Sequence, residues 1–297
     1  MCKEGRLNIN ESIFLQPLMN HKDSAWRGHA PFAGWLVEEF RPRTIVELGS
    51  HTGFSYLVFC QAVKALGYSA KCYAIDTWEG DIHAGLYGND IYKELKSYSD
   101  DLYGGTSNLL KMYFDNALNN FEDGSVDLLH IDGLHTYDAV KHDYETWKPK
   151  LSTQGIILFH DTCVKGRDFG VWKLWEELKD EYPSISFTHS SGLGCLFVGN
   201  DLNTSKLDFL KDPCKVIQAQ LLCSFLGKHV DEIHRLGKAA VALELLTHSS
   251  KAIEEQLRQQ LGILTDKCSH LELEIKQKND SSFKKITRHL IKSRRNF

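Results

Sequence analysis

Residues 44–53 read TIVELGSHTG, and this stretch decides the fold. A short run of β-branched and apolar residues reaches a carboxylate, a turn with two glycines follows, and FSYLVFCQAV (54–63) continues at helical spacing. This order predicts a strand, a tight turn and a helix. Open α/β sheets bind ligands in the crevice at the carboxyl ends of their strands, so the turn is a candidate ligand site. Its candidate residues are Glu47, Gly49, Ser50 and Gly53.

A second strand-like run, KCYAID (71–76), ends in an acid placed to accept hydrogen bonds from ribose hydroxyls, Asp76. The Gly-x-Gly-x-x-Gly of a dinucleotide fold is absent from the turn at 49–53, and Glu47 would repel a pyrophosphate. A carboxylate there suits a cationic ligand, and S-adenosylmethionine carries an amine and a sulfonium. Trp78 can pack on an adenine face just past the ribose acid, or it can be a core residue.

The bulk composition is ordinary for a soluble globular protein: 297 residues, 42% hydrophobic and 25% charged. A net charge of −4 argues against a nucleic-acid-coating surface. No apolar run approaches the ~20 residues that span a bilayer, and MCKEGRLNINES at the start lacks the apolar core of a signal peptide. The eight cysteines show no CxxC pairing, and Cys60, Cys72 and Cys195 lie in apolar runs as buried thiols. We therefore expect the reducing cytoplasm.

Strands are expected at 44–48, 71–76, 126–131 and 155–160, with helices between them and a first helix within 29–43. This alternation predicts an α/β fold with a doubly wound, Rossmann-like, mostly parallel sheet. Two further runs, SISFTH (184–189) and CLFVG (195–199), read as a terminal antiparallel pair.

Four motifs in this order, VELGSHTGFSY, YAIDTWEGD, LLHIDGLHTYDAVKHDYETW and GIILFHDT, make residues 29–200 resemble a class I S-adenosylmethionine-dependent methyltransferase. More narrowly, they resemble the bacterial branch with macrolide-sugar O-methyltransferases, cephalosporin-hydroxylase-like proteins and the methyltransferase modules of polysaccharide-assembly proteins. The resemblance implies S-adenosylmethionine as cofactor and a last strand inserted antiparallel. Around this domain we expect a lead-in or lid (1–28), a helical extension (201–280) and a basic amphipathic tail (281–297).

The next two expected strands end in Asp132 and Asp161, so two carboxylates should lie side by side at the crevice. Similar methyltransferases hold a divalent ion there, with one acid from the fourth strand and an acid pair from the fifth. Here the first member of that pair is His160, which can ligate or act as a base. The resemblance thus gives Asp132, His160 and Asp161 as ligands of Mg²⁺ or another divalent cation, and a metal-free acid–base site is the alternative.

The loop residue His135 is a further candidate base, because an imidazole with a pKa near 6.5 can take the proton of an attacking hydroxyl. The candidate catalytic residues are therefore His135, His160 and Asp132. The aromatic insertion 77–98 can cover the crevice and stack on sugar faces, or be an ordinary surface loop.

Beyond residue 201, apolar residues recur four and three apart: Leu257, Leu261, Leu264, Cys268, Leu271 and Ile275. This spacing predicts a short coiled coil that joins copies of the chain, or a helix packed back on the domain. The basic tail SSFKKITRHLIKSRRNF can rest on an anionic membrane or remain solvated. Similar sequences link such modules to glycosyltransferases, so the chain can be part of a larger assembly protein.

The function expected from these features is O-methylation of a sugar hydroxyl in a surface polysaccharide or glycosylated metabolite, by a cytoplasmic enzyme that peripherally touches the inner membrane face. One alternative is a non-catalytic, cofactor-binding scaffold of a polysaccharide-assembly complex. Another is a hydroxylase-like relative on the same fold, which would need an oxidisable metal. Nucleic acid is not an expected partner.

Overall fold

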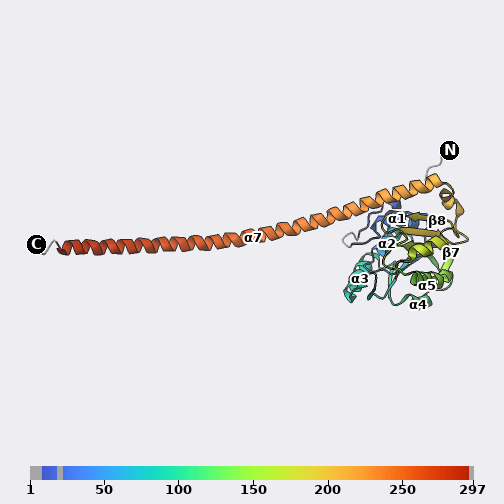
Figure 1. Ribbon diagram of the computed structural model, residues 1–297, viewed down its shortest axis with the longest axis horizontal. Coiled ribbons are helices and arrows are strands. Elements are labelled where there is room, and N and C mark those ends of the chain that lie inside the picture. Colours follow the sequence, from blue (N-terminus) through green and yellow to red (C-terminus); the bar gives the residue numbers. More distant parts are fainter. Residues whose placement is uncertain (1–8, 19–22, 294–297) are drawn as a thin grey trace. The chain divides into compact units, whose positions relative to one another are not determined.

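The chain builds a seven-stranded sheet with the strand order β5-β2-β1-β6-β7-β9-β8. Figure 1 shows the sheet among the helices that surround it. The computed structural model describes residues 9–18 and 23–293, without the side chains of residues 268 and 271–293. The strands of this sheet are β1 (Thr44–Leu48), β2 (Lys71–Asp76), β5 (Ser107–Lys111), β6 (Val126–Ile131), β7 (Leu151–His160), β8 (Ser184–Phe187) and β9 (Leu193–Phe197). β9 pairs antiparallel with both β7 and β8, and the other pairs are parallel.

The predicted fold class is confirmed, including the inserted antiparallel last strand and its antiparallel partner. The strands predicted from alternating apolar runs are all present, and β7 begins four residues earlier than expected, at Leu151. Strand β5 was not predicted. Its residues are half-buried or exposed at the edge of the sheet, so they carry no continuous apolar signal.

Helices cover both faces of the sheet because successive residues of β1 point to opposite sides. Ile45 enters a core that includes α1 and α2, whereas Val46 enters a core that includes α5 and α6. The α-helices are α1 (Ala30–Phe40), α2 (Phe54–Leu66), α3 (Asn89–Tyr103), α4 (Phe114–Ala117), α5 (Tyr137–Trp147), α6 (Val171–Leu178) and α7 (Pro213–Ser293). The short 3-10 helices are η1 (Glu11–Phe14), η2 (Arg27–His29), η3 (Leu118–Asn120), η4 (Lys148–Lys150) and η5 (Thr204–Lys211).

The insertion after β2 is a small hairpin, β3 (Gly80–Asp81) with β4 (Gly85–Leu86), followed by helix α3. The buried cysteines Cys60, Cys72 and Cys195 are free thiols, as predicted. Cys214 is disulfide-bonded, which the spacing of the cysteines did not indicate.

Helix α7 begins at Pro213, where a proline fits because the first turn needs no N–H donor. Contacts divide the chain into Met1–Gly237 and Lys238–Phe297, so the first turns of α7 belong to the first unit. Ala219, Cys223 and Val230 of α7 are buried there. Within the described residues, no helix is both long and apolar enough to cross a bilayer.

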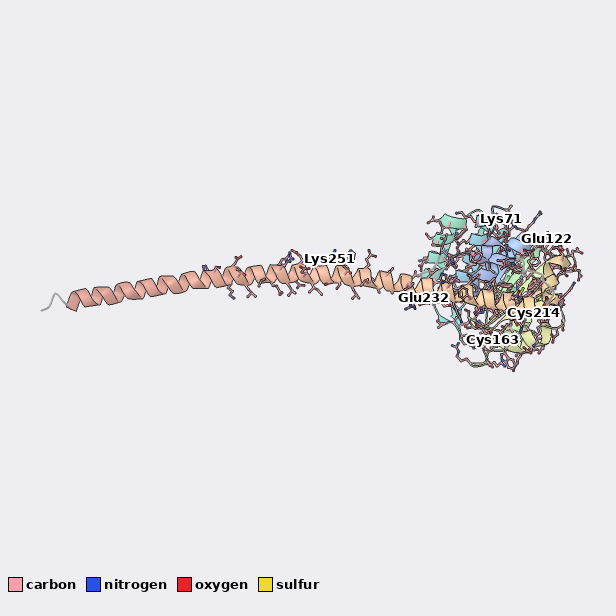
Figure 2. All side chains as sticks on the ribbon, turned by 90° about the horizontal axis from the view of Figure 1, so that it is seen from above. Lys71, Glu122, Cys163, Cys214, Glu232 and Lys251 are labelled. Carbon is pink, nitrogen blue, oxygen red and sulfur yellow. The ribbon has the colours of Figure 1, made fainter. Side chains whose placement is uncertain are left out.

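The second unit consists of the rest of α7, and it is described apart from the first. Residues 238–267 are exposed on every side of the helix, and Figure 2 shows side chains projecting from both sides of α7 around Lys251. Residues 281–293 of the expected basic tail continue the helix, while 294–297 and residues 1–8 and 19–22 of the lead-in lie outside the described residues.

Candidate active site

Three residues of the glycine turn after β1 have left-handed backbone: Gly49 (φ +84°), His51 (φ +46°) and Gly53 (φ +83°). A Cβ on Gly49 would lie 2.2 Å from the carbonyl oxygen of Asp132, at the end of the neighbouring strand. The glycine is therefore needed for close approach of two strand ends, and not only for access of a ligand. Gly53 ends the turn and is the N-cap of α2.

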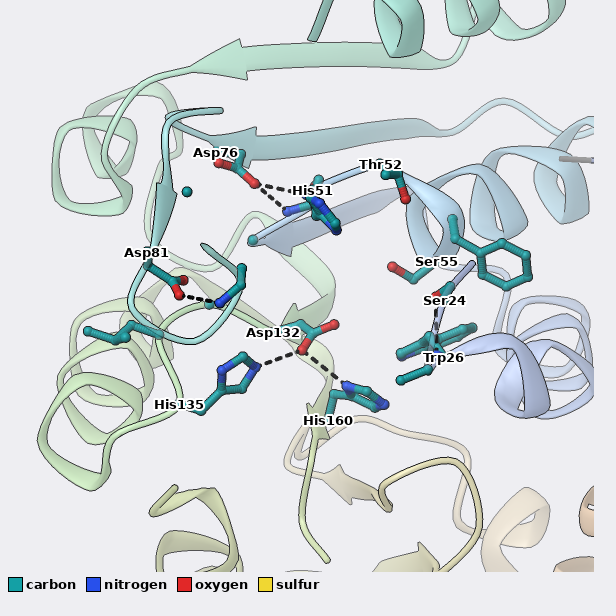
Figure 3. Close-up of a pocket in the computed structure, with 18 of the residues that line it drawn as sticks. Ser24, Trp26, His51, Thr52, Ser55, Asp76, Asp81, Asp132, His135 and His160 are labelled. Atoms are coloured by element: carbon teal, nitrogen blue, oxygen red, sulfur yellow. Dashed lines mark hydrogen bonds and ion pairs between the residues drawn. The ribbon is translucent and has the colours of Figure 1, made fainter. Parts of the chain in front are cut away.

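The carboxylate of Asp76, at the end of β2, accepts hydrogen bonds from this turn. One carboxylate oxygen accepts from the backbone N–H groups of Ser50 and His51, each at 2.9 Å, and the other accepts from Trp78 N–H at 2.7 Å. Asp76 therefore shapes the cofactor turn, and it still lines the cavity beside it (Figure 3). Its predicted contact with ribose hydroxyls stays a prediction.

A cavity of about 740 Å³ lies at the carboxyl ends of the strands. The glycine turn, the lead-in, the hairpin insertion and the ends of β6 and β7 all contribute to its walls. The polar and aromatic residues that line it include Asp23, Trp26, Arg27, Ser50, His51, Asp76, Asp81, Tyr87, Tyr113, Phe114, Asp132, His135, His160 and Asp161.

Three predicted cofactor residues, Glu47, Gly53 and Trp78, do not line this cavity. Glu47 is fully buried, and its carboxylate lies 2.8 Å from Nδ1 of His130. Trp78 is also buried, donates its indole N–H to the backbone oxygen of His51 at 2.9 Å and packs against Tyr92. The side chains of Glu47 and Trp78 therefore support the turn from inside the protein, and their predicted contacts with the cofactor stay predictions.

Aromatic residues that do line the cavity, Tyr113 and Phe114, could not be placed from the sequence. They follow β5, the strand that was not predicted. The run KMYFDNA would have indicated them once that strand was recognised.

The ends of β6 and β7 bring Asp132, His135 and Asp161 together. Figure 3 shows the side chains of Asp132 and His135 facing each other. The Nε2 atom of His135 lies 3.0 Å from Asp161 Oδ2 and 3.4 Å from Asp132 Oδ1. One ligand atom from each of the three residues lies within 4.8 Å of the others, so the group can hold a metal ion. The predicted proximity of Asp132 and Asp161 is thus present in the structure.

His160 plays a different part from the one predicted. Its Nδ1 faces Asp132 Oδ1 and its Nε2 faces the backbone oxygen of Ser190, both at 3.1 Å. A carboxylate and a carbonyl only accept, so both ring nitrogens donate and neither is free to bind a metal or take a proton. His160 therefore positions Asp132 in this structure, and its predicted part as a ligand or base stays a prediction. His135 is the third residue of the group that could hold a metal ion.

The pKa values in this cluster follow from its charges. Burial alone would lower the pKa of His135, but hydrogen bonds to Asp132 and Asp161 raise it to about 10. Burial alone would raise the pKa of Asp132, but His160 and His135 hold it well below its usual range. At neutral pH His135 is therefore protonated, and it must lose that proton before it can act as a base.

Residues 23–27 of the lead-in form one wall of the cavity, and the expected role of residues 1–28 as a lid stays a prediction. Trp26 is buried and donates its indole N–H to His130 at 3.1 Å. Helix α7 fastens this wall: Arg27 lies 3.6 Å from Asp231, and Gly227 packs against the backbone of Gly28.

We expect Gly227→Ala to destabilise the protein and slow turnover, because its Cβ would lie 2.3 Å from the backbone oxygen of Gly28. Gly237→Ala is the matched control in the same helix, since nothing lies within 4 Å of that position. Alanine in a helix interior is favoured over glycine by about 1 kcal/mol, so the control should stabilise. Thermal unfolding should thus give shifts of opposite sign, and equal shifts would contradict the packing of α7 on the wall.

The hairpin insertion also contacts the surroundings of the cluster formed by Asp132, His135 and Asp161. Asp81 and Tyr87 line the cavity, and the ring of His83 packs on Phe169, 4.5 Å between centroids. Phe169 in turn stacks on His135 at 4.6 Å. The insertion predicted to cover the crevice therefore contacts the loop beside the acids.

Comparisons with known proteins agree with this geometry. The profile of a family described as a methyltransferase domain matches residues 46–162. These residues hold the glycine turn, Asp76 and the Asp132–His135–Asp161 cluster, so the likeness to that family falls on the candidate site.

Among individual proteins, the chain is 50% identical over 187 residues to the uncharacterized protein y4gI of Sinorhizobium fredii. That match takes in 63% of this chain and 20% of y4gI, so the chain spans about a fifth of the length of this curated relative.

Solved structures with a distant likeness include the O-methyltransferase TomG of Streptomyces achromogenes in complex with S-adenosylmethionine. It shares 14% identity, with 65% of this chain and 92% of TomG covered and a TM-score of 0.44. A Bacillus cereus O-methyltransferase in complex with S-adenosylhomocysteine shares 14% identity over 60% of this chain and 83% of its own, with a TM-score of 0.44.

Proposed function

We propose that the chain transfers a methyl group from S-adenosylmethionine to a hydroxyl of a neutral, polyhydroxylated acceptor, a sugar of a surface polysaccharide or glycosylated metabolite. The observation that supports this most is the cluster of Asp132, His135 and Asp161 beside a glycine turn within a methyltransferase domain. The acids stand where an acceptor hydroxyl would have to be activated, next to the turn that would hold the cofactor.

The charge of the cavity supports a neutral acceptor. Five aspartates line it, at positions 23, 76, 81, 132 and 161, and the guanidinium of Arg27 lies close to two carboxylates, Asp231 and Asp23. An anionic acceptor such as a phosphorylated sugar or a coenzyme A ester would be repelled, whereas a cationic sulfonium would be favoured. Tyr87 and Tyr113 add aromatic surface on which sugar rings can pack.

The donors of the cluster fit a divalent cation, because carboxylates and an imidazole within 4.8 Å are ordinary ligands of Mn²⁺ and similar ions. Such a cation would neutralise Asp132 and Asp161 and lower the pKa of an acceptor hydroxyl. With the cation bound, Asp132, His135 and Asp161 would hold it and His160 would keep Asp132 in place. Without a cation, Asp132 and Asp161 would orient the hydroxyl, and His135, once deprotonated, would accept the proton.

The hydroxylase alternative needs two histidines and one carboxylate around an oxidisable metal. Among the described residues, this cluster offers the reverse, one histidine with two carboxylates, since both nitrogens of His160 are engaged. A scaffold that binds cofactor without turnover is tested directly by the assay below.

The test is an assay of S-adenosylhomocysteine formation with neutral oligosaccharides, followed by mass spectrometry of the acceptor for one added methyl group. We expect neutral sugars to be methylated and their phosphorylated counterparts to be spared. Cofactor binding without turnover on any neutral sugar would favour the scaffold instead.

Chelation tests the cation separately. We expect exhaustive treatment with EDTA to suppress turnover, and Mg²⁺ or Mn²⁺ to restore it, with cofactor affinity unchanged because the turn at 49–53 does not belong to the cluster. The remaining activity should rise as the pH approaches 10, because His135 loses its proton there. Full activity after chelation would remove the metal from the proposal and leave His135 as the base.

A further inference from the structure

Helix α7 carries a long row of mostly apolar residues, which we call the seam. Ten residues of unit Lys238–Phe297 recur three and four apart: Leu243, Leu246, Ser250, Ile253, Leu257, Leu261, Leu264, Cys268, Leu271 and Ile275. One step departs from the alternation, at Ile253–Leu257–Leu261, where two intervals of four follow each other. Such a stutter locally unwinds a coiled coil without ending it.

The seam has no cover within the described residues of this chain. Leu243, Leu246 and Ile253 are 67%, 68% and 55% exposed, and Leu257, Leu261 and Leu264 are 58%, 65% and 58% exposed. From 243 to 275 the helix rises about 50 Å at 1.5 Å per residue. A single helix with an apolar stripe of that length is not a stable arrangement in water.

We propose that this seam pairs with the same seam of a second copy, in a parallel, in-register, two-stranded coiled coil. The seam suits itself, because each apolar position of one helix meets the equivalent position of an identical helix. The flanking charges favour the parallel orientation. Lys267 is the last residue of the heptad that begins at Leu261, and Glu272 lies in the next heptad, which begins at Cys268. These two flanking positions face each other across a parallel pair, and their charges are opposite.

Two apolar residues off the seam provide a control. Leu245 and Ile263 are 66% and 68% exposed, as much as the seam residues, but each lies two positions after the first core position of its heptad. They would point away from the partner helix. The seam therefore predicts a specific difference between equally exposed leucines and isoleucines.

The mass of the full chain in solution, from sedimentation equilibrium at micromolar concentration, tests the pairing. We expect a dimer for the native chain and for the double variant Leu245→Lys with Ile263→Lys, and a monomer for Leu257→Lys with Leu264→Lys. Circular dichroism and cofactor binding are measured on each variant to check that the first unit stays folded. A native monomer, or a dimer that survives the seam substitutions, would overturn the proposal.

Oxidation of Cys268 tests whether the two helices of the proposed dimer run parallel. In a parallel, in-register pair the two Cys268 residues lie opposite each other at a core position, within reach of a disulfide. Mild oxidation should then give a covalent dimer in gels without reductant, and Cys268→Ser should abolish it. A dimer that forms no link through Cys268 would overturn the parallel arrangement and indicate antiparallel helices.

Discussion

Replacing Asp132 by asparagine should lower methyl transfer by on the order of 10²–10⁴-fold, the range that positioned acid–base groups contribute. Asp132 accepts from both His135 and His160, at 3.4 Å and 3.1 Å, and it belongs to the group that can hold a cation. An amide of the same shape keeps the packing but removes the charge. Both the orientation of the acceptor and the control of the His135 proton should therefore be lost.

The same substitution should lower the pKa of His135, which the carboxylates of Asp132 and Asp161 raise to about 10. Titration of the histidine ring followed by NMR measures this directly. Asp115→Asn is the matched control, because Asp115 also faces a histidine, His142, at 2.9 Å, but lies exposed outside the cluster. Unchanged turnover in Asp132→Asn, with cofactor still bound, would show that the cluster is not the reacting centre.

The positions of Asp132 and Asp161 could be predicted because they depend only on where strands end. Parallel strands end at one edge of a sheet, so two acids that each close an apolar run come together whatever the details. The glycine turn could be predicted for another reason. The strand before it and the helix after it have different hydrophobic periods, so the boundary between them can be seen in the sequence.

The roles of Glu47, Trp78 and His160 could not be predicted, because they depend on which way each side chain points. Glu47 is the last but one residue of β1, and the alternation of the strand turns it inward to His130. His160 faces the backbone of Ser190, far away in the sequence, and no local pattern indicates that contact. The wall made by Trp26 and Arg27 likewise depends on α7, through contacts between distant parts of the chain.

The second large effect that we expect is the loss of S-adenosylmethionine binding when Gly49, in the glycine turn at 49–53, is replaced by alanine. The new Cβ would lie 2.2 Å from the oxygen of Asp132, 2.7 Å from its carbonyl carbon and 2.8 Å from Cα of Gly133. All three are backbone atoms, so a change of side-chain rotamer cannot relieve the collision. The ends of β1 and β6 must separate, and the turn at 49–53 moves with them.

We expect cofactor affinity to fall on the order of 100-fold, about 2.8 kcal/mol of binding free energy, measured by calorimetry. Gly67→Ala is the matched control: Gly67 also has a left-handed backbone, φ +64°, but nothing lies within 4 Å of its Cβ position. Both variants should share the backbone strain of about 1–2 kcal/mol in thermal unfolding. Only Gly49→Ala should lose the cofactor, because only there does the strain come with a collision beside Asp132. Equal affinities in the two variants would place the cofactor away from this turn, and the proposed methyl transfer at Asp132 and His135 would lose its donor.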